Sequence, residues 1–424
     1  MDFDDSEKIL NKKYGKSKKY FLFLLIFLAV MEILDSYTTI FPQLIPSKVV
    51  EEFQLEDFEY TILVAWASLG MYFVLFIQFL ADIWGRRIFL FITLLGMGLA
   101  SVLMYFSNSP LMFTISLFFL YLFFSADIYT IFIAEESPKK QRSTYTNLIM
   151  VFGVLGSIAT ILFRMIFITD TSPVGSWRGM TYFGFLAIPI AFFALKTKET
   201  TAFQEFKIKR KSPDYKKEKL VKNFWKPFQS EHRVSFIIVI LISFIIGLNE
   251  PIGSVGELLL SEYYSPEDGT LILMAASVFA IISYLVTGRA SDKFGRRKIF
   301  FIYSAIFPFS ILLLSFGIKS DIYIVSLLSG LFGLSIRTFI SYGLLVQTRL
   351  LCVEFLPTKL RGIGTAWRST IFALGLTLGL FINSKLTKLF GDIGLAFFLV
   401  SLLFFAIIPL AKKCTETKGI DVIC

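Results

Sequence analysis

The sequence predicts an all-α membrane protein whose chain crosses a bilayer twelve times. Three observations support this fold class: the composition, the spacing of the apolar runs, and a set of polar motifs that occurs twice. Of the 424 residues, 55% are hydrophobic and 17% are charged, whereas a soluble domain carries about a quarter charged residues. Twelve helices of about 20 residues leave room for short loops and one longer connector. We therefore do not expect an enzyme with a soluble catalytic domain.

The apolar runs form two groups of six, separated by a basic connector at residues 196–233. The connector carries twelve Lys or Arg residues against five acids and contains Pro213 and Pro227, which indicates a linker and not a domain. The runs lie near residues 20–45, 59–81, 88–107, 111–134, 145–168, 179–195, 234–260, 270–288, 298–317, 321–353, 363–384 and 393–411. The expected parts are a cytoplasmic tail (1–19), a six-helix bundle (20–195), the connector (196–233), a second six-helix bundle (234–411) and a cytoplasmic tail (412–424).

The distribution of Lys and Arg predicts the orientation of the chain in the cytoplasmic membrane. If the N-terminus is inside, 33 of the 42 basic residues fall in cytoplasmic segments and five fall in outer loops. Short translocated loops avoid basic residues, so both termini are expected inside. The net charge of +10 follows from this topology, because the basic residues cluster between apolar runs and do not form a nucleic-acid surface. The remaining four basic residues lie within apolar runs: Arg164, Arg337, Arg349 and Arg368.

Cysteine and histidine show no ligand-like spacing in this sequence. The cysteines are Cys352, Cys414 and Cys424, and His232 is the single histidine. Metal sites and disulfide frameworks need several such residues at set spacings. We expect no metal and no cofactor other than a proton gradient.

Two polar motifs occur once in each half of the sequence and in the same order. Residues 78–87 (QFLADIWGRR) correspond to residues 288–297 (GRASDKFGRR), and residues 135–142 (EESPKKQR) correspond to residues 354–361 (EFLPTKLR). Tandem halves of this kind are typical of transporters.

With these motifs the chain resembles the major facilitator superfamily over nearly its whole length. Residues 288–297 match the superfamily's G-x-x-x-D-x-x-G-R-R loop, while the first copy departs from it at Gln78 and Ile83. The E-x-x-P-x-x-x-R motifs and Glu416-Thr-Lys-Gly419 resemble the sugar-porter and metabolite:proton symporter branch. The resemblance implies the major facilitator fold, with two pseudo-symmetric six-helix bundles, and transport by alternating access.

The resemblance also implies a cytoplasmic gate of charged residues that holds one conformation and breaks in the other. Its expected members are Asp82, Arg86, Glu135, Arg142, Asp292, Arg296, Glu354 and Arg361. The alternative is interfacial solvation combined with positive-inside topology, but topology alone needs only positive charge. Gly85 and Gly295 are expected to permit the tight turn between helices.

Polar residues lie within the runs that correspond to the cavity-lining first, fourth, seventh and tenth helices of the superfamily. Asp35 and Asp127 are candidate proton-coupling residues, because burial raises a carboxylate's affinity for protons and a nearby Arg lowers it. Their D-x-Y sequences resemble elements of phosphate:proton symporters. The candidate substrate-binding residues are Arg337, Asn249, Glu250, Tyr37 and Tyr129. Asn249 and Glu250 stand just before Pro251, where a helix break would expose backbone groups to a cavity. For each charged residue the alternative is a permanent ion pair between the halves, and for Arg337 it is a bridge to Asp35 or to Glu250.

Depth along the helices separates the other charged residues in the apolar runs. Arg164 lies about 33 Å above Arg142, so its side chain is expected to snorkel to the outer interface. Arg349 and Arg368 lie near the inner ends of their runs and are expected near the inner gate. Glu32 lies one turn before Asp35, either beside it or on the opposite side of the helix.

These residues favour a secondary transporter that imports a small polar metabolite with protons. Arg337 favours an anion, such as a carboxylate or a phosphate. One alternative is a sugar transporter, either a proton symporter or a facilitator, and a more remote one is a receptor of this fold that translocates nothing. The expected partners are a small-molecule substrate, protons and the lipid bilayer, with no nucleic acid, and the expected state is a monomer.

Overall fold

The computed structural model describes residues 17–123, 132–133, 136–137, 142–200, 203–204, 225–356 and 361–416. The regular structure of these residues is helical. Among them, eight helices are long and apolar enough to cross a membrane, and Pro110–Phe123 and Val151–Phe167 are shorter apolar helices. Each of the twelve predicted apolar runs contains helix, which confirms the prediction of an all-α membrane protein.

The contacts within the chain divide it into two compact units. Unit 1 consists of the described parts of Met1–Pro42, Leu69–Phe163 and Trp177–Lys217. Unit 2 consists of the described parts of Gln43–Ser68, Arg164–Ser176 and Glu218–Cys424. We use the terms first and second sequence half for residues 20–195 and 234–411.

Unit 1 is built around α6, against which α7, α10 and α11 pack. Its core gathers large apolar side chains such as Leu28, Leu94 and Phe132. Gly156 allows α9 to approach α2 closely, because a Cβ at this position would lie 2.3 Å from the carbonyl oxygen of Ile33. The elements are α2 (Lys18–Ile40), η1 (Phe41–Leu44), η2 (Leu69–Tyr72), α5 (Phe73–Trp84), α6 (Arg86–Tyr105), α7 (Pro110–Phe123), α9 (Arg142–Phe167), η3 (Val174–Thr181), α10 (Tyr182–Phe185) and α11 (Ala187–Ala194), of which η1, α9 and η3 continue into unit 2.

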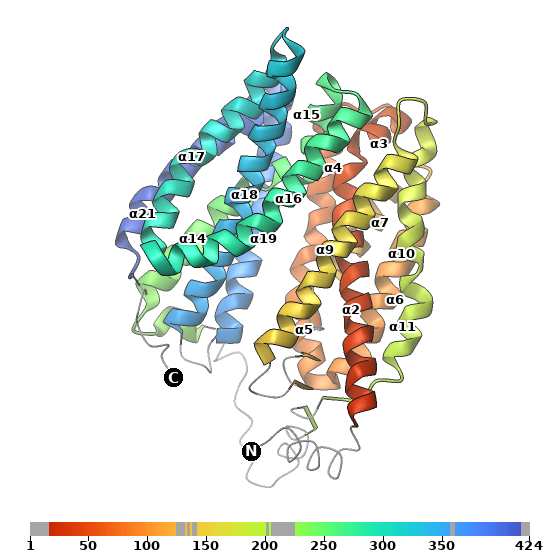
Figure 1. The fold of residues 1–424 in the computed structure, drawn as a ribbon, viewed down its shortest axis with the longest axis vertical. Coiled ribbons are helices and arrows are strands. Elements are labelled where there is room, and N and C mark those ends of the chain that lie inside the picture. Colours follow the sequence, from red (N-terminus) through yellow and green to blue (C-terminus); the bar gives the residue numbers. More distant parts are fainter. Residues whose placement is uncertain are drawn as a thin grey trace. The chain divides into compact units, whose positions relative to one another are not determined.

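Unit 2 is organised by two extensive helix pairs, α16 with α18 and α14 with α19 (Figure 1). Glycine makes the second pair close, because a Cβ on Gly247 would lie 2.2 Å from the carbonyl oxygen of Phe372. The elements are α3 (Pro46–Phe53), α4 (Asp57–Ser68), η4 (Lys226–Gln229), α14 (Arg233–Leu248), α15 (Pro251–Tyr263), α16 (Pro266–Phe294), α17 (Arg296–Phe316), η5 (Gly317–Lys319), α18 (Tyr323–Phe355), α19 (Arg361–Phe390), α20 (Ile393–Ser401), η6 (Leu402–Ala406) and α21 (Ile407–Lys413).

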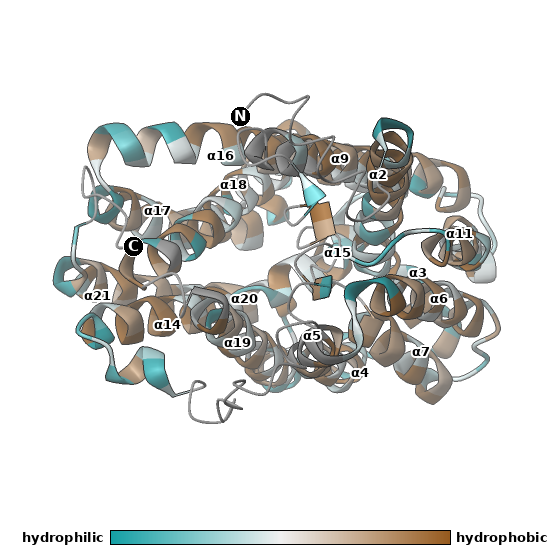
Figure 2. Cartoon of the chain, turned by 90° about the horizontal axis from the view of Figure 1, so that it is seen from below, coloured by the Kyte–Doolittle hydropathy of each residue, from teal (hydrophilic) through white to brown (hydrophobic). Residues whose placement is uncertain are grey.

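Large apolar side chains are exposed along the helices of both units, and Figure 2 shows hydrophobic residues over most of their length. Leu111 is 68% exposed in unit 1, and Phe309 is 64% exposed in unit 2. A soluble protein rarely leaves so much apolar surface in water, so these side chains identify the surface that faces lipid. The chain is a multi-pass membrane protein.

Candidate transport site and gates

The seventh predicted run is interrupted at the position that the sequence indicates. Helix α14 ends at Leu248, and α15 begins at Pro251, which has no N–H to continue the ladder. Asn249 and Glu250 form the turn between them, with backbone N–H groups that donate to Ile246 and Gly247. The predicted helix break is therefore present, and it turns a backbone carbonyl toward a charged side chain.

That side chain is Arg337 of α18. Its Nη2 lies 3.0 Å from Oε2 of Glu250 and 3.4 Å from the carbonyl oxygen of Asn249. Gly253 leaves space for this pair, because a Cβ there would lie 2.7 Å from Oε1 of Glu250 and 3.1 Å from Nη1 of Arg337. The structure thus brings together three of the predicted substrate-binding residues, in unit 2.

The Arg337–Glu250 pair is incompletely satisfied. The side chain of Arg337 is 3% exposed, whereas that of Glu250 is 21% exposed. Within the described residues, Nε of Arg337 and Oδ1 of Asn249 are buried and have no hydrogen-bond partner. A buried polar atom without a partner costs about 1–3 kcal/mol, so this arrangement is suited to receiving polar atoms from a ligand.

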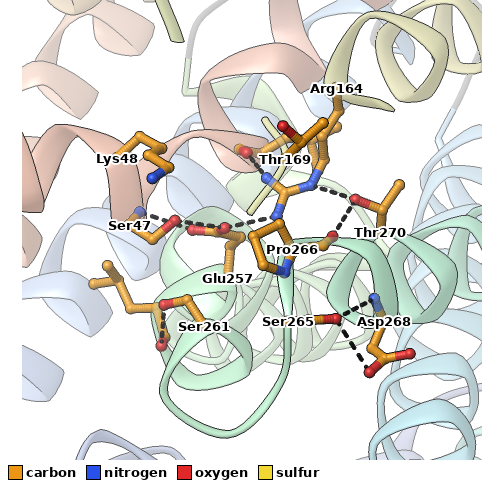
Figure 3. Close-up of polar contacts among 12 residues, drawn as sticks. Ser47, Lys48, Arg164, Thr169, Glu257, Ser261, Ser265, Pro266, Asp268 and Thr270 are labelled. Atoms are coloured by element: carbon orange, nitrogen blue, oxygen red, sulfur yellow. Dashed lines mark hydrogen bonds and ion pairs between the residues drawn. The ribbon is translucent and has the colours of Figure 1, made fainter. Parts of the chain in front are cut away.

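A second arginine of unit 2, Arg164, has all three of its donor nitrogens engaged (Figure 3). Its Nε donates to Thr270 Oγ1 at 3.0 Å, its Nη2 donates to Glu257 Oε1 at 2.8 Å, and its Nη1 donates to the carbonyl oxygen of Leu44. Glu257 also accepts from the backbone N–H and the hydroxyl of Ser47, each at 2.8 Å. We call these five residues the Arg164 cluster.

The Arg164 cluster corrects the expectation that Arg164 snorkels. The side chains of Arg164 and Glu257 are only 3% and 1% exposed, so the guanidinium is buried and does not reach an interface. The physical reason is that Glu257 and the Leu44 carbonyl supply a counter-charge and an acceptor at the same depth. Glu257 was not among the residues predicted from the sequence, although an acid within an apolar run is a signal for such a partner.

A cavity of about 220 Å³ lies beside the Arg164 cluster. Lys48, Glu51 and Ser261 contribute polar groups to its lining. Lys48 pairs with Glu51 at 2.9 Å within α3, whereas Arg164 pairs with Glu257. The cavity gives water a place next to the buried ion pair.

Asp57, the first residue of α4, has an altered proton affinity. Burial, followed by the negative charges of Glu262, Glu56 and Glu257, raises the pKa of Asp57 to about 6. Like charges and desolvation both disfavour the ionised carboxylate. Asp57 therefore titrates in the range of mildly acidic media.

In unit 1, Asp35 is buried on α2 at 7% exposure. Tyr37 is also fully buried, and its hydroxyl donates to the carbonyl oxygen of Met180 at 2.7 Å. Glu32 faces α9, because a Cβ on Gly153 would lie 2.5 Å from its Oε1. Glu32 therefore lies on the side of α2 that faces α9, while the roles of Asp35 and Tyr37 stay predictions.

Both G-R-R turns use glycine for two reasons. Gly85 and Gly295 have φ angles of 116° and 93°, which only glycine adopts readily. A Cβ on Gly85 would also lie 2.2 Å from Oε2 of Glu199, and one on Gly295 would lie 2.8 Å from Oε2 of Glu416. The predicted tight turns are present.

Glu199 and Glu416 act as equivalent caps in the two units. Glu199 accepts hydrogen bonds from the backbone N–H groups of Arg86 and Arg87 at the start of α6. Glu416 accepts from Arg296 and Arg297 at the start of α17, at 3.0 and 3.1 Å. A carboxylate at a helix N-terminus satisfies free donors and the helix dipole. This gives a physical role to the acid that follows the last helix of each sequence half.

Three predicted gate residues meet in unit 2. Nη2 of Arg296 lies 2.9 Å from both Asp292 Oδ1 and Glu354 Oε1. Asp292 is 72% exposed and Glu354 is 17% exposed, so the second contact is the better shielded. In unit 1, Arg86 lies 5.2 Å from the ring of Phe203.

The other predicted site residues are placed only in part. Asp127, Tyr129 and Glu135 lie outside the described residues, as do the side chains of Asp82, Arg142 and Arg361. Arg368 is buried and donates to Ser369 Oγ, whereas Arg349 is exposed. Within the described residues, no group of three or more His, Cys, Asp or Glu side chains could hold a metal ion.

Apolar helices long enough to cross a membrane, an interrupted helix and buried ion pairs are features of membrane transporters, and a match to a family of transporters indicates a transporter and not an enzyme. The chain belongs to the Major Facilitator Superfamily, whose family model matches residues 22–336. This confirms the family that the duplicated motifs indicated. No curated protein sequence matches the chain.

Solved structures of transporters share the fold at low sequence identity. The inward-open xylose transporter XylE from E. coli is 17% identical with a TM-score of 0.69, over 93% of this chain and 97% of that one. A mutant of the nucleoside transporter NupG is 12% identical with a TM-score of 0.68, over 92% and 98%. A bacterial homologue of the human lysosomal transporter Spinster is 13% identical with a TM-score of 0.68, over 94% and 95%. The major facilitator fold is thereby confirmed.

Proposed function

We propose that this protein moves a small anionic metabolite, such as a carboxylate or a phosphate, across the cytoplasmic membrane with protons. The proposal includes alternating access and cytoplasmic termini. The observation that carries it is Arg337, a buried guanidinium held beside an interrupted helix. A charge at this depth costs at least about 2.5–3.5 kcal/mol on insertion scales, so it is retained where function needs it.

The Arg337–Glu250 ion pair offers a way to couple binding of the anion to uptake of a proton. When Glu250 is ionised, it neutralises Arg337 and competes with an incoming anion. When Glu250 takes up a proton, Arg337 is left with an uncompensated buried charge, and the substrate's negative group replaces the carboxylate. The net charge around the guanidinium stays the same, so one proton accompanies one negative charge. Glu250 thus joins Asp35 as a candidate proton-binding group.

The second candidate is sugar transport, which a different observation favours. With Glu250 ionised, the pair is electrically neutral, and the free Oδ1 of Asn249 suits a hydroxyl donor. A structure described as a D-xylose-proton symporter shares the fold, at 17% identity and a TM-score of 0.70. A neutral substrate would bind without breaking the pair.

Uptake into proteoliposomes tests the proposal. Labelled carboxylates, phosphate, sugars and nucleosides are offered with an inward proton gradient to the unaltered protein and to Arg337→Lys, Arg337→Gln and Lys388→Gln. Lys388→Gln is the matched control, because it removes an exposed cation from a neighbouring helix.

For an anion, the apparent affinity should fall about tenfold in Arg337→Lys, through loss of the guanidinium fork, and about a hundredfold in Arg337→Gln. Lys388→Gln should be unchanged. Sugar uptake that is insensitive to Arg337→Gln would replace the anion proposal with the second candidate. Binding of a solute without accumulation of any would instead indicate a receptor.

A further inference from the structure

The Arg164 cluster joins residues that are far apart in the sequence. Leu44, Ser47 and Arg164 belong to the first sequence half, and Glu257 and Thr270 belong to the second. The contact between Ser47 and Glu257 spans 210 residues, and that between Arg164 and Glu257 spans 93. All five residues lie in unit 2. Figure 3 shows Glu257 and Thr270 in contact with the guanidinium of Arg164, and Ser47 in contact with Glu257.

Every nitrogen and oxygen atom of the two side chains in the ion pair makes a hydrogen bond. Each donor nitrogen of Arg164 has an acceptor, and both oxygens of Glu257 accept hydrogen bonds. Thr270, which accepts from Arg164, donates in turn to the carbonyl oxygen of Pro266 at 2.6 Å. A buried pair of this kind holds when it is complete and fails when one partner leaves, since each charge then remains in a medium of low dielectric constant. The ion pair therefore has two distinct states, intact and broken.

The cluster lies at the end of the helices that topology places outside. Leu44 and Ser47 border the first predicted outer loop, Arg164 is near the outer end of its run, and Thr270 follows the turn after α15. Alternating access requires the two sequence halves to separate on this side when the substrate enters. The cluster is therefore a connection that transport has to break.

We propose that Arg164 and Glu257 form the latch of the outer gate, closed by Ser47, Leu44 and Thr270. This inference rests on the proposed function only in that it assumes alternating access; it is independent of the substrate. The latch is closed in this structure. The cavity beside it admits water, which would solvate the two charges as they part. The counterpart on the cytoplasmic side is the predicted gate, so the molecule would use ion pairs at both ends.

Labelling of an introduced cysteine from outside the cell tests the latch. Ser254 is 8% exposed and lies on α15 one turn before Glu257, on the side of the helix interruption. In a background without Cys352, Cys414 and Cys424, Ser254→Cys is exposed to a membrane-impermeant maleimide on intact cells. The rate of labelling then reports opening of the outer gate, and it needs no substrate.

Glu257→Gln and Arg164→Gln should each raise the labelling rate about tenfold or more, which is the effect of losing a charge-assisted hydrogen bond. The labelling rate of the double variant should rise by less than the product of the two single increases, because both substitutions remove the same interaction. Thr270→Val, which keeps the ion pair, should raise the rate about threefold. The control is Glu51→Gln, which breaks the Lys48–Glu51 pair inside the first sequence half and should leave the rate unchanged.

Folding is monitored in each variant by its size-exclusion profile. If the Arg164 and Glu257 variants do not fold, the labelling rates of Thr270→Val and Ser47→Ala test the latch instead. Each of these substitutions removes one neutral partner and leaves no buried charge unpaired. Unchanged labelling in every folded variant would overturn the latch. So would an equal rise in Glu51→Gln. Loss of uptake for all solutes with the predicted labelling pattern would instead count against the proposed function alone.

Discussion

Two arginine–glutamate pairs of unit 2, Arg164–Glu257 and Arg337–Glu250, have the same chemistry and differ in completeness. In the first pair both side chains are at most 3% exposed, and each of the three donor nitrogens of the arginine makes a hydrogen bond. In the second, the glutamate is 21% exposed, and the arginine's buried Nε has no partner within the described residues. Burying a charge does not determine its role; the unsatisfied atoms around it do. A complete pair is suited to hold a structure closed, and an incomplete one is suited to exchange its partner for a ligand.

Neutralising the acid of each pair should affect the stability of the protein to different degrees. Glu257→Gln should lower the free energy of unfolding by about 3 kcal/mol, because the guanidinium of Arg164 stays buried without a counter-charge. Glu250→Gln should lower it by only about 1 kcal/mol, since water reaches the more exposed site. Denaturant unfolding in detergent at pH 7 measures both. Equal losses would mean that the two pairs are energetically alike.

A second prediction concerns proton coupling and separates Asp35 from the latch. Asp35→Asn mimics the protonated acid, so uphill uptake driven by a one-unit pH gradient should fall by about tenfold per coupled proton, to equilibration. Counterflow exchange, which needs no net proton movement, should be retained. Wild-type accumulation in Asp35→Asn would remove this residue from the coupling mechanism and leave Glu250 as the remaining described candidate.

A third prediction uses the two acids that share Arg296. Glu354→Gln should destabilise the protein by about 1 kcal/mol, and Asp292→Asn by less than about 0.5 kcal/mol, because the Asp292 carboxylate is largely in solvent. Thermal unfolding compares the two variants. A larger effect of Asp292→Asn would show that exposure is a poor guide to the worth of an ion pair in this protein.

Asp57 should make the stability of the protein slightly dependent on pH. Its pKa is about 6 in the folded protein and about 3.9 in an unfolded chain. Between these values the folded state binds more protons, so stability falls as the pH rises from about 4 to about 6. Asp57→Asn should therefore raise the unfolding temperature by about 2 °C at pH 7 and leave it unchanged at pH 4. A rise of the same size at both values would rule out titration of Asp57 as the cause.

The sequence was sufficient for the fold and for singling out the residues of one of the two pairs. Helix spacing predicted the spans, Asn249-Glu250-Pro251 predicted the interruption, and depth along the tenth run selected Arg337. Pairing of Arg337 with Glu250 was one of two alternatives, because a sequence does not show which face of a helix meets which neighbour.

The Arg164 cluster could not be predicted in the same way. Depth alone placed Arg164 near an interface, and a long side chain there usually snorkels. Its burial depends on Glu257 and on the Leu44 carbonyl, which come within reach only when distant segments pack together. The capping role of Glu199 and Glu416 was likewise hidden, since each cap lies more than a hundred residues from the helix that it caps.

The number of protons taken up when the anion binds shows whether Glu250 yields Arg337 to the substrate. Calorimetry in buffers of different ionisation enthalpy, with the anion selected by the uptake panel, gives the protons taken up per anion bound. At a pH where Glu250 is ionised in the empty site, the unaltered protein should take up about one proton more than Glu250→Gln. Glu257→Gln should match the unaltered protein. The same uptake in Glu250→Gln as in the unaltered protein would contradict the claim.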